Sequence, residues 1–153
     1  MDNLHLNFSK HSAVNIYDIA DIERAVKGKI YPAGCTLIPL SAATSTPNKY
    51  MKEPGDVETR YAVAIPKDGV NSKYLFIAIE RAYERFKYRY MTTINMQFGQ
   101  LKHLELDYHE DGKVQDEIVR MVQEAERLER KEQAIVEHLQ AQKKYFMGTM
   151  FPK

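Results

Sequence analysis

The stretch that decides the fold is residues 115–153, which read QDEIVRMVQEAERLERKEQAIVEHLQAQKKYFMGTMFPK. It contains no glycine or proline before Gly148. In a seven-residue frame, Glu132 and Gln142 occupy two of the a and d positions. The other seven a and d positions are apolar: Ile118, Met121, Ala125, Leu128, Ile135, Leu139 and Phe146. This pattern predicts a helix of the coiled-coil type, with one narrow apolar seam that pairs with another helix.

The length of this helix indicates that it needs a partner. Residues 115–147 would span roughly 50 Å at 1.5 Å per residue. The remaining ~110 residues make a domain with a radius of gyration of about 13 Å. We therefore expect the helix to extend beyond its own domain, so that part of its seam requires a second chain. The expected division is a globular domain over residues 1–112 and a helix with its tail over residues 113–153.

Composition fits one globular domain with an extension. The chain has 153 residues, of which 44% are apolar, and no stretch approaches the ~18 apolar residues of a membrane span. The N-terminus lacks the basic and apolar regions of a secretory signal. Cys35 is the only cysteine, which excludes an internal disulfide and fits a reducing compartment. We expect a cytoplasmic protein that does not bind membranes.

The first 112 residues predict an α+β domain, with a small mixed sheet and short helices. Apolar, β-prone runs indicate strands over residues 35–40, 61–65 and 101–106. Residues 16–25 alternate weakly and fit either a strand or a helical turn, of which we favour a short strand. Residues 31–34 (YPAG) have turn chemistry. Asn71 or Ser72 can cap a helix that runs to about Tyr90.

Charge is balanced but unevenly distributed. Net charge is +1, which argues against a strongly basic nucleic-acid-binding protein of the usual kind. Residues 81–90 (RAYERFKYRY) nevertheless interleave four basic residues with aromatic ones, which suits phosphate contacts. Residues 41–52 hold short hydrogen-bonding side chains of the kind that read base edges. The alternative for residues 81–90 is an amphipathic helix whose aromatic side packs on the sheet. The alternative for residues 41–52 is an ordinary surface loop.

Signals for catalysis are weak. The sequence contains no phosphate-binding glycine loop, nucleophile elbow, zinc-type Cys/His spacing or cofactor fingerprint. His103, Glu105, Asp107 and His109 alternate, so a strand would place them on one face, where a metal site could be drawn. We favour a solvated strand face with Leu104 and Leu106 turned inward. The chain is therefore expected to be neither an enzyme nor a metal or cofactor binder.

Three groups of residues resemble the specificity subunit of type I restriction-modification systems. The first is residues 17–24 (YDIADIER) and 28–34 (GKIYPAG), similar to the start of a target recognition domain. The second is residues 71–75 (NSKYL), 92–97 (TTINMQ) and 101–104 (LKHL), similar to the closing part of that domain. The third is the heptad stretch with residues 143–144 (KK) and 150–152 (MFP), similar to the connecting helix and tail.

The resemblance implies a non-catalytic subunit that reads double-stranded DNA. Such a subunit positions methyltransferase (modification) subunits, which use S-adenosylmethionine themselves, and through them the restriction subunits. On this basis residues 1–112 are the target recognition domain, and the expected DNA contacts are Lys29, Thr44, Thr46, Asn48, Lys49, Arg85, Lys87, Arg89, Thr92 and Thr93.

The chain departs from the family pattern, which has two recognition domains and two long antiparallel helices. With one domain and one helix it resembles a half-subunit. The simplest arrangement is a homodimer whose helices act as a spacer between the two halves of a split DNA target. Pairing with another half-subunit and a fragment of a longer protein stay open. A coiled-coil adaptor or regulator that binds protein partners of such a complex is the alternative function.

Overall fold

The computed structural model describes residues 5–91 and 93–151. The chain divides into two units, Met1–Glu117 and Ile118–Lys153, with the division inside one helix. Across the described residues, no helix is both long enough and apolar enough to cross a membrane.

The first unit combines short strands with one long helix, so the predicted α+β class is confirmed. Its elements are β1 (Ser12–Asn15), α1 (Ile16–Ile19), β2 (Ala20–Arg24), β3 (Ile30–Tyr31), β4 (Thr36–Pro39), β5 (Lys49–Tyr50), β6 (Gly55–Asp56), β7 (Tyr61–Pro66), α2 (Ser72–Tyr90), the 3-10 helix η1 (Phe98–His103) and β8 (Glu105–Tyr108). The strands form antiparallel sheets of order β2-β7-β4-β5, β1-β8 and β3-β6, rather than the single mixed sheet that we expected.

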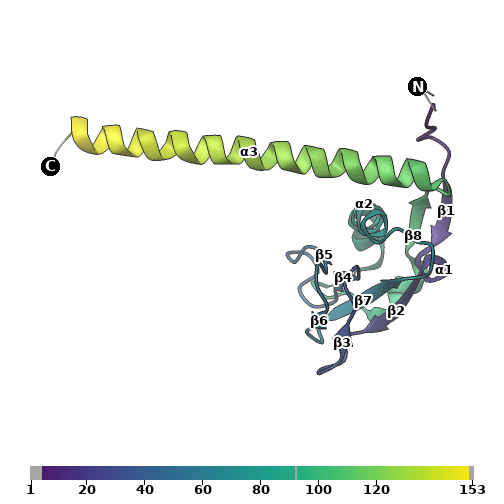
Figure 1. Cartoon of the computed structure of the whole chain (residues 1–153). Helices are drawn as coiled ribbons and strands as arrows, with labels where there is room; N and C mark the ends of the chain where they lie inside the picture. The colour runs from purple at the N-terminus through teal and green to yellow at the C-terminus, as the bar shows by residue number, and fades with distance from the viewer. Residues whose placement is uncertain (1–4, 92, 152–153) are drawn as a thin grey trace. The chain divides into compact units, whose positions relative to one another are not determined.

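One part of the core lies between the four-stranded sheet and α2, which contacts β4, β5 and β8 (Figure 1). A second cluster of buried residues includes Tyr31, Leu37 and Tyr61 and no residue of α2. All four residues of β4 are buried, as are the first four of β7. The buried face of α2 includes Leu75, Ile79 and Phe86. Asn71 caps α2 as predicted, because its Oδ1 accepts hydrogen bonds from the backbone N–H groups of Lys73 and Tyr74 at 3.1 Å.

The strand predicted over residues 16–25 is half wrong. Its first part is the helical turn α1, and only Ala20–Arg24 is a strand. The cause is local: Asn15 Oδ1 accepts a hydrogen bond from Tyr17 N–H at 3.0 Å and caps the turn. Ile16 and Ile19, three residues apart, are then both buried.

The strand predicted over residues 101–106 is also shifted. Residues 98–103 form η1, and the strand begins only at Glu105. Leu101 and Leu104 are both buried and three residues apart, the spacing that a 3-10 turn brings onto one side. Leu104 and Leu106 do face inward, as expected, with 1% and 0% exposure.

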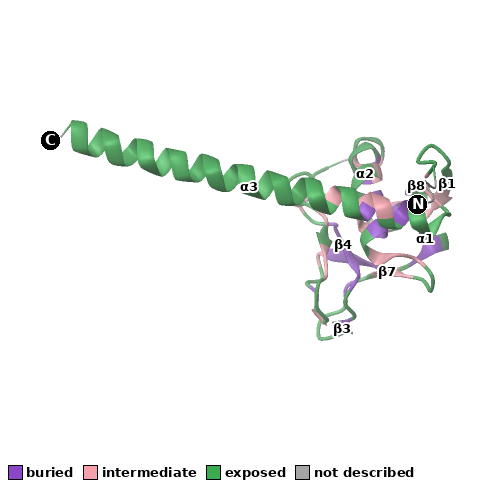
Figure 2. Ribbon diagram, turned by 45° about the horizontal axis from the view of Figure 1, so that its top comes forward, coloured by how far each residue is buried: buried purple, intermediate pink, exposed green. Residues whose placement is uncertain are grey.

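The long helix is α3, Gly112–Met150. It extends the predicted range of residues 115–147 by three residues at each end. Asp111 caps its start, since its Oδ1 accepts a hydrogen bond from Lys113 N–H at 2.9 Å. Within the second unit every described residue from Gln123 onward is exposed (Figure 2).

Candidate nucleic-acid interface and helix-pairing surface

The loop after β4 is held by the segment that follows α2. The Ala43 N–H donates to Ile94 O at 2.7 Å, and the Met96 N–H donates to Leu40 O at 2.8 Å. Between these bonds, Ala42 N–H donates to Asn95 Oδ1 at 3.0 Å. The predicted contact residue Thr93 lies in this same segment, where its Oγ1 accepts from Asn95 N–H at 3.2 Å. Residues 41–48 are thus fixed at their start rather than free.

Three predicted DNA-contact residues line one small cavity. Thr46, Asn48 and Lys87 meet there, in a space of about 70 Å³. The side-chain oxygen of Asn48 is buried and has no hydrogen-bond partner among the described residues. Lys87 already has an ion-pair partner, because its ammonium lies 2.8 Å from Glu84, and its side chain is only 14% exposed. The cavity therefore offers an unsatisfied polar group beside a mostly paired cation.

The other two predicted contacts on α2 lie on a different face of the helix. Arg85 and Arg89 line a groove of about 620 Å³ together with residues of β1, η1 and β8. Arg85 is 77% exposed and lies 4.0 Å from Asp107. A spacing of four residues places Arg85 and Arg89 one above the other, whereas Lys87 points about 160° away. The basic run of residues 81–90 is thus split between two surfaces.

Lys29 is engaged elsewhere. Its ammonium lies 2.5 Å from Glu23 on β2 and 5.0 Å from the centre of the Tyr31 ring. The hydrogen bond from Lys29 lowers the pKa of the Glu23 carboxyl, and the same bond raises the pKa of Lys29. Lys29 thus has local partners and lines neither the cavity at Asn48 nor the groove at Arg85.

The remaining predicted contacts lie on the loop side of the unit or outside the described residues. Thr44 is exposed within the loop. Lys49, on β5, lies over the Tyr61 ring at 5.5 Å from its centre. Thr92 lies outside the described residues. The structure therefore brings Thr46 and Asn48 together with Lys87, whereas Arg85 and Arg89 line the separate groove and Lys29 lines neither.

Two residues of these surfaces were missed by sequence reasoning. Asn95 shapes the loop through its bond to Ala42, but no local pattern marks it. Lys102 lines the groove beside Arg85 and Arg89. The strand predicted over residues 101–106 places Lys102 on the same face as the inward-facing Leu104. Lys102 was therefore not expected at the surface of a groove.

The histidines near β8 have separate partners. The His103 ring stacks on Tyr90, with centroids 5.0 Å apart and planes within 7°. The His109 ring uses both nitrogens: Nδ1 lies 2.7 Å from Tyr74 Oη, and Nε2 lies 2.8 Å from Phe8 O. Over residues 5–91 and 93–151, no three His, Cys, Asp or Glu side chains converge as metal ligands.

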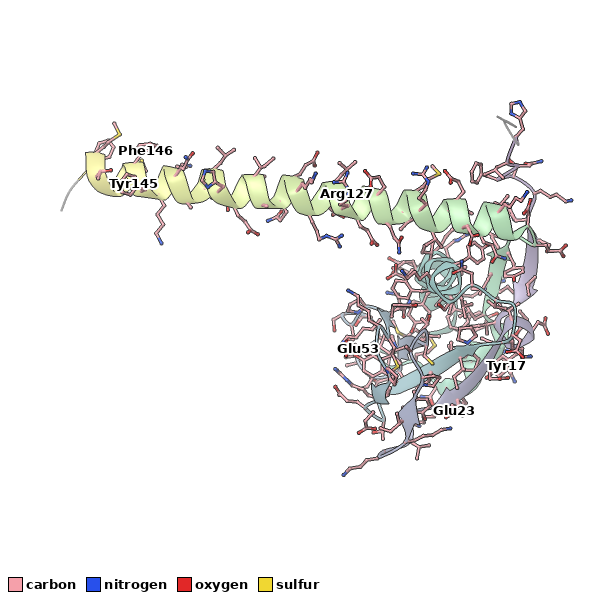
Figure 3. All side chains as sticks on the ribbon, viewed as in Figure 1. Tyr17, Glu23, Glu53, Arg127, Tyr145 and Phe146 are labelled. Atoms are coloured by element: carbon pink, nitrogen blue, oxygen red, sulfur yellow. The ribbon has the colours of Figure 1, made fainter. Side chains whose placement is uncertain are left out.

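The predicted seam of α3 is an exposed apolar row within the second unit. Met121, Leu128, Ile135, Leu139 and Phe146 are each between 49% and 59% exposed. Ala125 is exposed as well, and Ile118 is partly buried. Figure 3 shows Tyr145 and Phe146 near the C-terminal end of this helix. The seam is therefore free to pair.

Away from the seam, the surface of α3 carries ion pairs. Arg127 donates two hydrogen bonds to the Glu124 carboxylate, at 2.9 and 2.5 Å. These bonds lower the pKa of Glu124. Such a solvated, charged side is what a pairing helix presents to water.

Comparison with known proteins finds no matching family model, curated protein or solved structure.

Proposed function

We propose that the chain is a non-catalytic DNA-recognition subunit that reads one half of a split target and pairs with a second copy through α3. In this role it positions methyltransferase subunits of a restriction-modification complex. The observation that carries the proposal is the loop of residues 41–48, which is pinned by residues 94–96 and presents short polar side chains beside α2.

The loop has the properties needed to read bases. Base-specific contacts require hydrogen-bonding groups that are held in place and not already satisfied. The bonds at Ala42 and Ala43 supply the first condition. The side-chain oxygen of Asn48 meets the second condition once the loop opens, because it is unpartnered but buried, and a base amino group would then satisfy it. Thr46 and Thr44 add hydroxyl groups on the same loop.

The exposed seam of α3 supports pairing of two copies. Five large apolar side chains are about half exposed along a helix of 39 residues, a pattern that a second helix would cover. Glu132 and Gln142 within the seam reduce stability but restrict register. In an antiparallel pair in which the a positions of one helix face the d positions of the other, Leu128 of one copy lies against Leu139 of the other.

Charge favours the antiparallel arrangement. Residues 118–129 hold three glutamates against two arginines, whereas residues 139–150 hold two lysines and no acid. An antiparallel pair places the basic end of each helix beside the acidic end of the other. A parallel pair would set Lys143 and Lys144 against their own copies. The antiparallel pair also gives the two domains the two-fold symmetry of a split site.

A second candidate is a coiled-coil adaptor that binds protein partners. It is favoured by the end of α3, where Tyr145, Phe146, Met147, Met150 and Phe151 are all at least 54% exposed. Such a cluster suits a protein surface as well as it suits a second copy. The two candidates differ in their requirement for the loop, which an adaptor does not need.

Methylome sequencing tests the proposal directly. Cells that carry the chain with its methyltransferase are compared with cells from which only this chain is deleted. We expect one split sequence motif to lose methylation on deletion, and the motif to change in an Asn48→Ala, Thr46→Ala strain. A motif that survives the deletion contradicts the DNA-recognition role, and a motif lost on deletion but unchanged in the loop variant favours the adaptor.

A further inference from the structure

We propose that the groove between the C-terminal half of α2 and residues 102–107 binds the phosphate backbone of the DNA duplex. This inference rests on the proposed function and assigns a surface to it. It concerns the side of α2 that faces away from the cavity at Asn48. Its key members are Arg85, Arg89 and Lys102, of which Lys102 was not among the expected contacts.

The groove has an apolar floor and a basic rim. Phe86, Leu104 and Leu106 line it and are at most 6% exposed. Arg85, Arg89 and Lys102 also line it and are exposed. The two arginines lie one helical turn apart, about 6 Å along α2. Their charges are therefore arranged in a row, which suits successive phosphates on a strand better than one small anion.

The cations of the groove are not neutralised by its acids. Arg81 and Arg85 lie 3.9 and 4.0 Å from the same Asp107 oxygen, and both are about three-quarters exposed. Exposed pairs at such distances contribute little free energy, so they can open for another anion. Arg89 and Lys102 have no ion-pair partner among the described residues.

A count of charges gives the groove a positive balance. The lining contains three cations, Arg85, Arg89 and Lys102, and two anions, Glu105 and Asp107, which leaves one positive charge in excess. Arg81 adds a further cation beside the groove, 3.9 Å from Asp107. This local excess contrasts with the even balance of the first 112 residues. A polyanion would gain from the excess without needing a basic protein.

The wall that carries Lys102 is held in place. Asn15 Nδ2 donates to Lys102 O at 2.7 Å, while Asn15 Oδ1 accepts from Tyr17 N–H. On the facing wall, Tyr90 stacks on His103. These contacts join the end of α2 to η1, so the basic side chains project from a fixed frame.

The groove and the loop lie on two faces of α2, and each has a different role in the proposed recognition of DNA. Glu80, Tyr83, Glu84 and Lys87 face the cavity at Asn48, and Ala82, Arg85, Phe86 and Arg89 face the groove. Backbone contacts fix the orientation of a protein on DNA, while contacts to base edges carry the sequence information. The groove accordingly supplies affinity and salt dependence, and the loop supplies preference for a sequence.

Salt-dependent binding to a labelled duplex of mixed sequence tests the groove. Fluorescence anisotropy is measured between about 50 and 200 mM KCl, where each phosphate contact contributes about 0.9 to the slope of log affinity against log salt. We expect the triple variant Arg85→Ala, Arg89→Ala, Lys102→Ala to lower the slope by about 2–3 and the affinity at least tenfold. If that variant unfolds, Arg85→Gln, Arg89→Gln should lower the slope by about 1–2.

The matched control removes three exposed lysines that do not line the groove, by Lys27→Ala, Lys52→Ala and Lys73→Ala. We expect its slope to stay within one unit of the wild type. A groove variant that keeps the wild-type slope overturns the groove as the backbone site and leaves DNA recognition standing. A wild-type chain that binds no duplex at any of these salt concentrations overturns both.

Discussion

The side-chain oxygen of Asn95 accepts a hydrogen bond of 3.0 Å from the backbone N–H of Ala42. Ala42 has a φ of 54°, the left-handed region in which a residue with a Cβ is strained by about 1–2 kcal/mol. The chain thus holds the start of the loop in an unfavourable conformation, and a side chain more than fifty residues away stabilises it. Strain of this kind collects at functional sites, which agrees with the proposed role of this loop in reading DNA.

Substitution at this pair should move stability in opposite directions. Ala42→Gly removes the Cβ that is strained and should raise the free energy of unfolding by about 1 kcal/mol. Asn95→Ala leaves the Ala42 N–H without its partner and should lower the free energy of unfolding by about 1 kcal/mol. Urea unfolding monitored by circular dichroism measures both. A less stable Ala42→Gly variant would show that the loop conformation is not strained.

Tyr74 should be a strong contributor to stability through its hydroxyl. The hydroxyl accepts from His109 N–H at 2.8 Å and lies 2.7 Å from His109 Nδ1, while the ring is buried. Tyr74→Phe leaves these groups unsatisfied and should cost about 1–3 kcal/mol in urea unfolding. Tyr88→Phe is the control, since Tyr88 is 90% exposed, and its stability should match the wild type. Equal stability of both variants would show that the hydrogen bonds between the Tyr74 hydroxyl and His109 do not stabilise the fold.

Stability should fall at alkaline pH because of the buried thiol. Burial raises the pKa of Cys35 from 9.0 to about 11. The thiol therefore ionises at lower pH in the unfolded chain than in the folded one. Its contribution to the free energy of unfolding is complete below pH 9, and about 2–3 kcal/mol of that contribution is lost as the pH rises from 9 to 11. Burial also raises the pKa of Tyr74 and Tyr83, which adds to the loss above pH 10.

Cys35→Ala separates the thiol from the tyrosines. Its free energy of unfolding should fall less between pH 9 and 11 than that of the wild type, whatever its stability at pH 7. In the folded wild type the thiol should also resist alkylation at pH 8, because it is buried and protonated. Rapid labelling of the folded protein would contradict this environment for Cys35.

Pairing through α3 should depend on the seam and not on the outer face. Leu128→Glu, Leu139→Glu places charges in the seam and should convert a dimer into a monomer at tens of micromolar in sedimentation equilibrium. Gln123→Glu, Gln140→Glu adds the same charges outside the seam and should leave the dimer intact. A wild-type monomer at these concentrations contradicts self-pairing.

The direction of pairing has its own test. In a Cys35→Ala background, Leu128→Cys mixed with Leu139→Cys should form a disulfide-linked heterodimer if the helices are antiparallel with Leu128 facing Leu139. Each variant alone should then cross-link poorly. Efficient cross-linking of Leu128→Cys with itself would instead indicate a parallel pair.

Strong local signals were enough to predict the main elements. The glycine-free heptad stretch predicts α3, and Asn71 before an apolar period predicts α2 with its cap. The YPAG turn is also confirmed, since Gly34 has a φ of 90°, which glycine adopts without strain. Residues 98–106 could not be predicted, because Leu104 lies three residues after Leu101 and two before Leu106, so this short run fits both a 3-10 turn and a strand.

The surfaces were harder to predict than the elements. Sequence places Arg85, Lys87 and Arg89 in one basic run, and only the helix separates Lys87 from the arginines. The partners of the loop, residues 94–96, lie about fifty residues away along the chain, so no local pattern reveals them. Lys102 reaches the groove through tertiary packing of η1 against the end of α2.

The most direct test of DNA recognition is selection of duplexes by the isolated chain from a library of random sequence. We expect enrichment of a two-part sequence whose halves are related by two-fold symmetry and separated by a spacer of fixed length, because the proposed dimer joins two identical domains through paired α3 helices. The Leu128→Glu, Leu139→Glu variant should enrich single halves or none. A wild-type pool that stays random after repeated rounds would contradict the account.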